Sequence, residues 1–171
     1  MGKTTRYCGI DPSTKTGFVI LNKKGEVVHE SEFTSDNDDP QRMLDIWLQI
    51  EQHINVKTDL VCIEGFSFRS KGRRVDFQYG LGWLIRAFLH LKGVQYIDVA
   101  PKQLKKFACN NGNVKKEEMV EPILEKWGFK GRTDNITDAY VLAKMAHGTF
   151  YQTNLLPYEQ NIISDLLNKN Q

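Results

Sequence analysis

The spacing of hydrophobic positions changes several times along the chain, and each change predicts a strand or a helix. Short apolar runs predict strands at residues 7–11, 18–21 and 27–33, and the turn residues at 22–25 predict a hairpin between the last two. An acidic loop at 35–39 then precedes a segment whose apolar residues recur at helical spacing, from Met43 to Ile50. We therefore expect a helix there, with Pro40 at its first position.

The rest of the chain alternates strand and helix patterns. Apolar runs predict strands at 60–64 and 95–99, and helical periodicity predicts helices at about 79–93, from Pro101 onward, at 115–127, at 133–148 and, weakly, at 159–167. Pro122 makes the helix at 115–127 less regular. This order of elements predicts an α/β fold with a mixed five-stranded sheet flanked by helices. We expect one domain over residues 1–150 and a peripheral C-terminal tail over 151–171.

The composition is that of an ordinary globular protein, because 40% of the 171 residues are hydrophobic and 26% are charged. The three cysteines cannot all pair and none has CxxC spacing, which fits a reducing compartment. No apolar run approaches the ~20 residues of a membrane span, and residues 1–6 lead into a strand rather than a signal-peptide core. These features predict a cytoplasmic protein that does not bind membranes.

The net charge of +2 is the sum of unlike segments. Residues 65–132 carry 14 basic and 6 acidic side chains, a net charge of +8, whereas residues 1–64 carry −4 and residues 133–171 carry −2. A concentration of positive charge in the middle of the chain is typical of a surface that binds a polyanion such as a nucleic acid.

Three carboxylates stand in unusual contexts. Asp11 and Glu64 each end an apolar strand, and Asp138 lies inside the most apolar helical segment. Loops at the carboxyl ends of strands open into ligand-binding crevices, and oxygen ligands are those that Mg²⁺ prefers. Two such ions on a phosphodiester can activate water and stabilise the leaving oxygen. Singly, each acid also fits an ordinary role as a turn, strand-end or half-exposed helix residue, but the three together favour a site.

These residues resemble the motifs of a known family. The segments Gly9-Ile10-Asp11-Pro12-Ser13 with Thr16-Gly17, then Ile63-Glu64, then Thr137-Asp138-Ala139 resemble the RuvC family of Holliday-junction resolvases, and most of all its phage-encoded branched-DNA endonucleases. The resemblance spans residues 5 to about 150. It implies an RNase H-like fold, a homodimer, and a role in DNA recombination and repair. It also implies cleavage of Holliday junctions and other branched DNA, dependent on two Mg²⁺ or Mn²⁺ ions, giving 5′-phosphate and 3′-hydroxyl ends.

The last motif departs from the bacterial pattern, in which an Asp or His lies three positions before the final aspartate. That position is Asn135 here, and Asp134 lies four positions before Asp138. On a helix, offsets of three and four place both residues within about 60° of Asp138, so either one can face the same site. Asp134 is alternatively a helix N-cap. The expected metal ligands are therefore Asp11, Glu64 and Asp138, completed by Asp134 or Asn135.

Basic and aromatic residues near these acids are candidates for DNA contact, since lysine and arginine neutralise phosphates. The basic candidates are Arg69, Lys71, Arg73, Arg74, Lys102, Lys105, Lys106, Lys115 and Lys116. Residues 100–105 resemble a family segment whose basic residues contact DNA. In the bacterial family an aromatic residue that unstacks the junction lies where this chain has Ser67, and Phe66 and Phe68 flank that position. Each phenylalanine either wedges between bases or packs into the core.

Two other functions compete with a nuclease. A junction-binding module that does not cleave is favoured by the neutral Asn135. An ATP-binding protein of the actin-like superfold also begins with a strand-end aspartate, but the chain leaves no room for a second lobe and has no glycine-rich adenosine motif.

Overall fold

The computed structural model describes residues 4–66 and 75–169. Five strands form one sheet in the order β3-β2-β1-β4-β5. The strands are β1 (Arg6–Asp11), β2 (Thr16–Leu21), β3 (Val27–Phe33), β4 (Asp59–Glu64) and β5 (Gln95–Val99). β1, β2 and β3 are antiparallel neighbours, whereas β1, β4 and β5 run parallel. The predicted mixed five-stranded sheet is confirmed.

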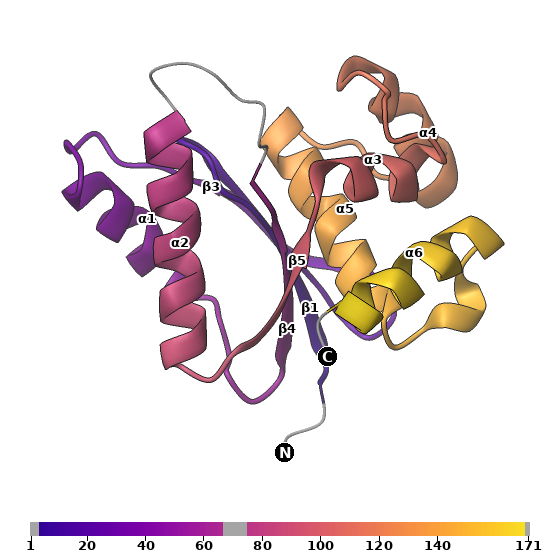
Figure 1. Cartoon of the computed structure of the whole chain (residues 1–171), viewed down its shortest axis with the longest axis horizontal. Coiled ribbons are helices and arrows are strands. Elements are labelled where there is room, and N and C mark those ends of the chain that lie inside the picture. Colours follow the sequence, from indigo (N-terminus) through magenta and orange to yellow (C-terminus); the bar gives the residue numbers. More distant parts are fainter. Residues whose placement is uncertain (1–3, 67–74, 170–171) are drawn as a thin grey trace.

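Helices cover both faces of this sheet (Figure 1). On one face lie α1 (Gln41–Glu51) and α2 (Val75–Leu91). On the other lie α3 (Pro101–Cys109), α4 (Val120–Trp127), α5 (Asp134–Gly148) and α6 (Pro157–Lys169). Short 3₁₀ turns occur at Glu117–Met119 and Gln152–Asn154. The central strands are therefore buried on both faces, which explains why their sequences are continuous apolar runs.

The backbone of α5 lies directly on the sheet. A Cβ atom added at Gly9 would lie 1.9 Å from the carbonyl oxygen of Ala139, and one added at Gly17 would lie 2.0 Å from that of Asn135. Only glycine leaves space for this approach. Because α5 is enclosed by the sheet and by the helices outside it, residues around most of its circumference are buried rather than one stripe. The close approach brings the side chain of Asp138 down to the strand ends.

Two predictions about the second half of the chain are wrong. The helix expected over 115–127 begins only at Val120, after the 3₁₀ turn, so Lys115 and Lys116 precede it. Pro122 falls in the first turn of α4, where backbone N–H groups have no intrahelical partner, and is tolerated there. The tail is not peripheral, since Ile162 and Ile163 of α6 are buried in the core beside α5. In the part of the chain that the structure describes, no helix is both long and apolar enough to cross a membrane.

Candidate functional site

Asp11 and Glu64 end two adjacent parallel strands. The register pairs Ile10 with Ile63, so the two carboxylates occupy the next row of the ladder. Both face α5, because alternate residues of a strand point to the same side and Gly9 already lies against α5. Asp138 descends from α5 to meet them, and Asp11 and Asp138 are each only 4% exposed. The structure therefore brings the three acids together at one end of the sheet, and their role as metal ligands stays a prediction.

Burial and mutual repulsion govern the charges of these acids. Burial raises the pKa of Asp11 well above its ordinary value, and the negative charges of Glu64 and Asp138 raise it further. Burial also raises the pKa of Glu64, although its hydrogen bond with Asp11 opposes that shift. Carboxyl groups held this way favour a cation, because a cation restores their ionised forms.

Lys116 supplies a positive charge inside the acidic cluster. Its Nζ donates to Oδ2 of Asp138 at 2.7 Å. Burial lowers the pKa of Lys116, but the charge and hydrogen bond of Asp138 outweigh burial and raise it overall. Burial raises the pKa of Asp138, and the Lys116 ammonium opposes that rise. The Lys116 side chain is 46% exposed, so this cation lies between the acids and solvent.

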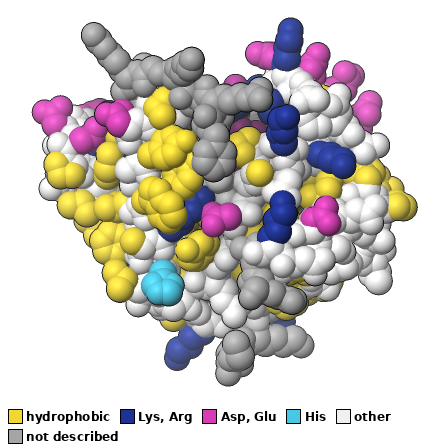
Figure 2. All heavy atoms as spheres, in the orientation of Figure 1, with side chains coloured by type: hydrophobic (Ala, Val, Ile, Leu, Met, Phe, Trp, Pro, Cys, Tyr) yellow, Lys and Arg dark blue, Asp and Glu magenta, His cyan; other side chains and the backbone are white. Residues whose placement is uncertain are grey.

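A cavity of about 290 Å³ opens beside the acids. Glu64 and Asp138 line it together with the cations Lys105 and Lys116, and Phe66 lies on its wall along with residues of α2. Figure 2 shows the same division on the molecular surface, with basic side chains over the α3 and α5 side and hydrophobic side chains gathered over α2. The cavity therefore combines negative charge at its base, positive charge at one rim and apolar surface at the other.

Contacts with α2 hold Phe66 in place on the apolar wall of the cavity. The Phe66 ring stacks on Tyr79 with centroids 4.7 Å apart and lies 5.4 Å from the ring of Trp83. A Cβ added at Gly82 would lie 2.7 Å from the Phe66 ring, and the guanidinium of Arg86 lies 4.7 Å from its centroid. Phe66 is half-buried and packs on α2 at the cavity wall rather than in either core cluster, and its contact with bases stays a prediction.

Arg86 is a residue of the site that the sequence reasoning did not identify. It is buried on the apolar face of α2, and its guanidinium donates to Oδ1 of Asp98 at 2.7 Å and to the carbonyl oxygen of Glu64 at 3.0 Å. These bonds hold the end of β4 in place. An arginine at a position where helical spacing predicts an apolar residue is the signal that would have found it.

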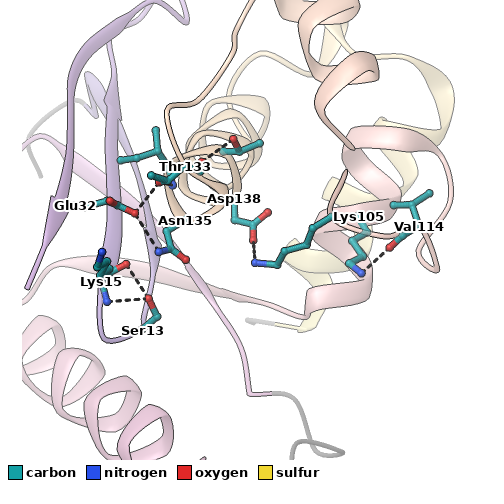
Figure 3. Close-up of polar contacts among 11 residues, drawn as sticks. Ser13, Lys15, Glu32, Lys105, Val114, Thr133, Asn135 and Asp138 are labelled. Atoms are coloured by element: carbon teal, nitrogen blue, oxygen red, sulfur yellow. Dashed lines mark hydrogen bonds and ion pairs between the residues drawn. The ribbon is translucent and has the colours of Figure 1, made fainter. Parts of the chain in front are cut away.

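The predicted basic residues divide into two groups. Lys105 is half-buried, and its Nζ donates to the carbonyl oxygen of Val114 at 2.7 Å, which ties α3 to the loop before Lys116 (Figure 3). Lys102, Lys106 and Lys115 are exposed. The predicted DNA-contact residues Phe68, Arg69, Lys71, Arg73 and Arg74 lie outside the described residues.

Asp134 and Asn135 both lie in the first turn of α5, but they differ in burial and in their contacts. The N-cap is Thr133, whose Oγ1 accepts from the backbone N–H of Ile136 at 3.3 Å, so the alternative of Asp134 as N-cap is wrong. Asp134 is exposed. Asn135 is half-buried, and its Nδ2 donates to Oε1 of Glu32 at 3.1 Å (Figure 3). Sequence reasoning missed Glu32, which lies 103 residues away in the chain.

The donor chemistry of the cluster fits a hard divalent cation. Within residues 4–66 and 75–169, no three acidic, histidine or cysteine side chains are spaced to hold a metal ion as they stand. The cluster nevertheless offers only oxygen donors from Asp11, Glu64 and Asp138, whose negative charges oppose one another. Carboxylate oxygens around concentrated negative charge are typical ligands of Mg²⁺.

Comparison with known proteins bears on the fold. The chain matches no protein-family model, and no curated protein has a significantly similar sequence. Among solved structures its fold is RNase H-like, as the resemblance predicted. The Thermus thermophilus RuvC structure matches with a TM-score of 0.69 and 19% identity, over 86% of this chain and 95% of that chain. T. thermophilus RuvC in complex with Holliday junction substrate matches with a TM-score of 0.66 and 20% identity, over 86% of this chain and 94% of that chain.

Proposed function

We propose that the chain is a RuvC-like endonuclease that cleaves Holliday junctions and other branched DNA with the help of divalent metal ions. One observation carries the proposal: the carboxyl groups of Asp11, Glu64 and Asp138, from β1, β4 and α5, interact with one another beside a cavity that two of them line together with two lysines, in a fold shared with RuvC. In one of the matching structures, T. thermophilus RuvC is in complex with a Holliday junction substrate. A phage origin and a cytoplasmic location stay predictions.

The proposed ligands of the metal are Asp11, Glu64 and Asp138, with a further oxygen from the first turn of α5. Asn135 is a better candidate than Asp134 for that oxygen, since it is half-buried while Asp134 is exposed. Two bound Mg²⁺ or Mn²⁺ ions would activate water and stabilise the leaving oxygen, which gives 5′-phosphate and 3′-hydroxyl ends.

The chain's own residues bind and orient the DNA in this proposal. Lys105 and Lys116 line the cavity and attract the phosphate to be cleaved. Without these positive charges, the carboxylates of the acidic cluster would repel that phosphate. The exposed Lys102, Lys106 and Lys115 add affinity for neighbouring phosphates. The stacked rings of Phe66 and Tyr79 offer an apolar surface to the adjacent base.

A homodimer is part of the proposal, and exposed apolar side chains on α2 support it. Trp83 is 61% exposed and Leu91 is 77% exposed on that helix, and Leu48 of α1 is 50% exposed at the groove between the two helices. A two-fold dimer built on this surface would present two sites to the two symmetric strands of a four-way junction.

A second candidate function, junction binding without cleavage, has one observation in its favour. The neutral Asn135 stands where the bacterial family has an Asp or a His, and Lys116 already occupies a position beside Asp138. In this case the lysine would remain the permanent counter-charge of the acids, and DNA would be held without hydrolysis.

Cleavage of a labelled four-way junction separates the two candidates. We expect the unmodified protein to cut the junction in Mg²⁺ or Mn²⁺, and the Asp11→Asn variant to bind it without cutting. A linear duplex of the same sequence is the matched substrate control. Tight binding with no cutting by the unmodified protein in either metal would favour the binding module. Equal rates on duplex and junction would contradict specificity for branched DNA.

A further inference from the structure

One row of residues crosses the sheet from the acidic cluster to its edge. The register pairs Asp11 of β1 with Gly17 of β2, and Gly17 with Glu32 of β3. Directly paired residues of antiparallel strands point to the same face, so Glu32 faces α5 as Asp11 does. Gly17 has no side chain, and the carbonyl oxygen of Asn135 fills the space above it. Asn135 therefore lies between Glu32 and the acidic cluster.

The Glu32 carboxylate determines which way the Asn135 amide points. Its Oε1 accepts from Nδ2 of Asn135 at 3.1 Å and from Oγ1 of Thr133 at 2.6 Å. An ionised carboxylate only accepts hydrogen bonds, so it binds the nitrogen end of the amide and excludes the oxygen end. Figure 3 shows Glu32 on one side of Asn135 and Asp138 on the other, with the amide oxygen turned away from Glu32.

The position of Asn135 on α5 completes the arrangement. Residues three apart on a helix are neighbours on its surface, so Asn135 and Asp138 project to the same side. With its nitrogen bound to Glu32, the amide offers an oxygen donor toward the acids. In the reverse orientation it would present an NH₂ group, which cannot ligate a cation and would repel one.

We infer that Glu32 is a positioning residue for the candidate metal site, which acts by fixing Asn135 as an oxygen ligand. The inference rests on the proposed function, because it needs a metal ion at the acidic cluster. It assigns a role to a strand residue outside the acidic cluster and its motifs. It also explains how a neutral amide can serve as a metal ligand at position 135. An aspartate there would need no orientation, because both ends of its carboxylate are oxygens.

The variant Glu32→Gln tests the inference with Mn²⁺ as the probe. A glutamine side chain presents either an oxygen or an NH₂ group, so Asn135 is free to turn. We expect Mn²⁺ to bind the full chain about 10-fold more weakly, as measured by titration calorimetry. The control is Glu30→Gln, two residues earlier on the same strand, which removes an ion pair with Arg132 (3.1 Å) and leaves Asn135 held. Its Mn²⁺ affinity should equal that of the unmodified protein.

A rescue experiment distinguishes orientation from mere structural support. In the double variant Glu32→Gln/Asn135→Asp, the side chain at position 135 has an oxygen at both ends, so its orientation no longer matters. We expect Mn²⁺ affinity to return at least to that of the unmodified protein, with the circular dichroism spectrum unchanged in both variants. Unchanged affinity in Glu32→Gln, or no recovery in the double variant, would overturn the inference.

The Asp11→Asn variant shows which proposal has failed. If it binds Mn²⁺ as tightly as the unmodified protein, the acidic cluster is not the metal site and both proposals fall. If Asp11→Asn loses affinity while Glu32→Gln does not, the metal site stands and only the role of Glu32 is refuted.

Discussion

Along each central strand, successive side chains alternate between the face under α5 and the face under α1 and α2, yet the two sets differ in kind. Cys8, Ile10 and Ile63 are packed among apolar residues on the α1 and α2 side. Their neighbours Gly9, Asp11 and Glu64 face α5, where glycine admits a helix backbone and the acids gather. One face of the sheet thus stabilises the fold through packing of apolar side chains, and the other brings carboxyl groups together at the strand ends.

The largest predicted effect comes from placing an acid on the packing face. Ile10 is fully buried in the cluster beside α1 and α2, among other apolar side chains. We expect Ile10→Asp to lower the free energy of unfolding by more than about 4 kcal/mol, because a carboxylate would be buried without a partner. Circular dichroism and urea unfolding measure the loss. A stable, folded variant would mean that the two faces do not differ as described.

Two glycine substitutions compare the closeness of packing on the two faces. A Cβ at Gly17 would lie 2.0 Å from a backbone oxygen of α5, whereas one at Gly80 on α2 would meet only the flexible end of Met43 at 2.9 Å. We expect Gly17→Ala to destabilise the fold by about 1–3 kcal/mol. Gly80→Ala should be neutral or stabilising by up to about 1 kcal/mol, since alanine favours the helix. Similar urea midpoints for both variants would contradict this difference.

The acids give the metal-free protein a pH-dependent stability of predictable sign. Because the pKa of Asp11 is raised by burial and by neighbouring acids, the folded state holds a proton that the unfolded state releases. Stability should therefore fall as pH rises above the ordinary carboxyl value of about 3.9. Asp11→Asn should remove much of this slope and be more stable at pH 7 by about 1 kcal/mol. Urea unfolding at several pH values in EDTA measures both, and parallel curves would contradict the expectation.

The smallest predicted effect concerns the lysine at the cavity. If Lys116 contacts a phosphate, Lys116→Gln should reduce the salt dependence of junction binding by about one unit of slope. Lys24, in the hairpin turn at the opposite end of the sheet, is the matched control, and Lys24→Gln should leave the slope unchanged. Binding measured in EDTA at several salt concentrations gives both slopes, and equal slopes for the two variants would exclude the contact.

The sequence patterns predicted those features of the fold that depend on the local spacing of apolar residues. All five strands agree with prediction to within about two residues, because a buried strand is a short apolar run bounded by turns. The convergence of Asp11 and Glu64 followed from the rule that parallel strand ends meet at one edge of a sheet. The segment at 115–127 failed because a 3₁₀ turn and an α-helix share similar residue preferences over a few positions.

Contacts between distant segments were beyond this reasoning. The bonds of Glu32 to Asn135 and of Arg86 to the end of β4 join elements whose approach depends on the sheet order and on glycine positions. The contact of Lys116 with Asp138 likewise depends on where the loop before α4 crosses α5. The spacing of residues along the chain does not show which distant segments meet in space. The sequence alone therefore identifies candidate residues but does not show which of them contact one another.

The contact between Lys116 and Asp138 has a consequence for the order in which the protein matures. A cluster of acids that only a metal neutralised would leave newly made chains dependent on metal supply before they could fold. Here a side chain of the same polypeptide balances part of that charge from the start. If the acids bind a metal as proposed, folding and metal loading can then proceed as separate events, because part of the acidic charge is already balanced within the folded chain.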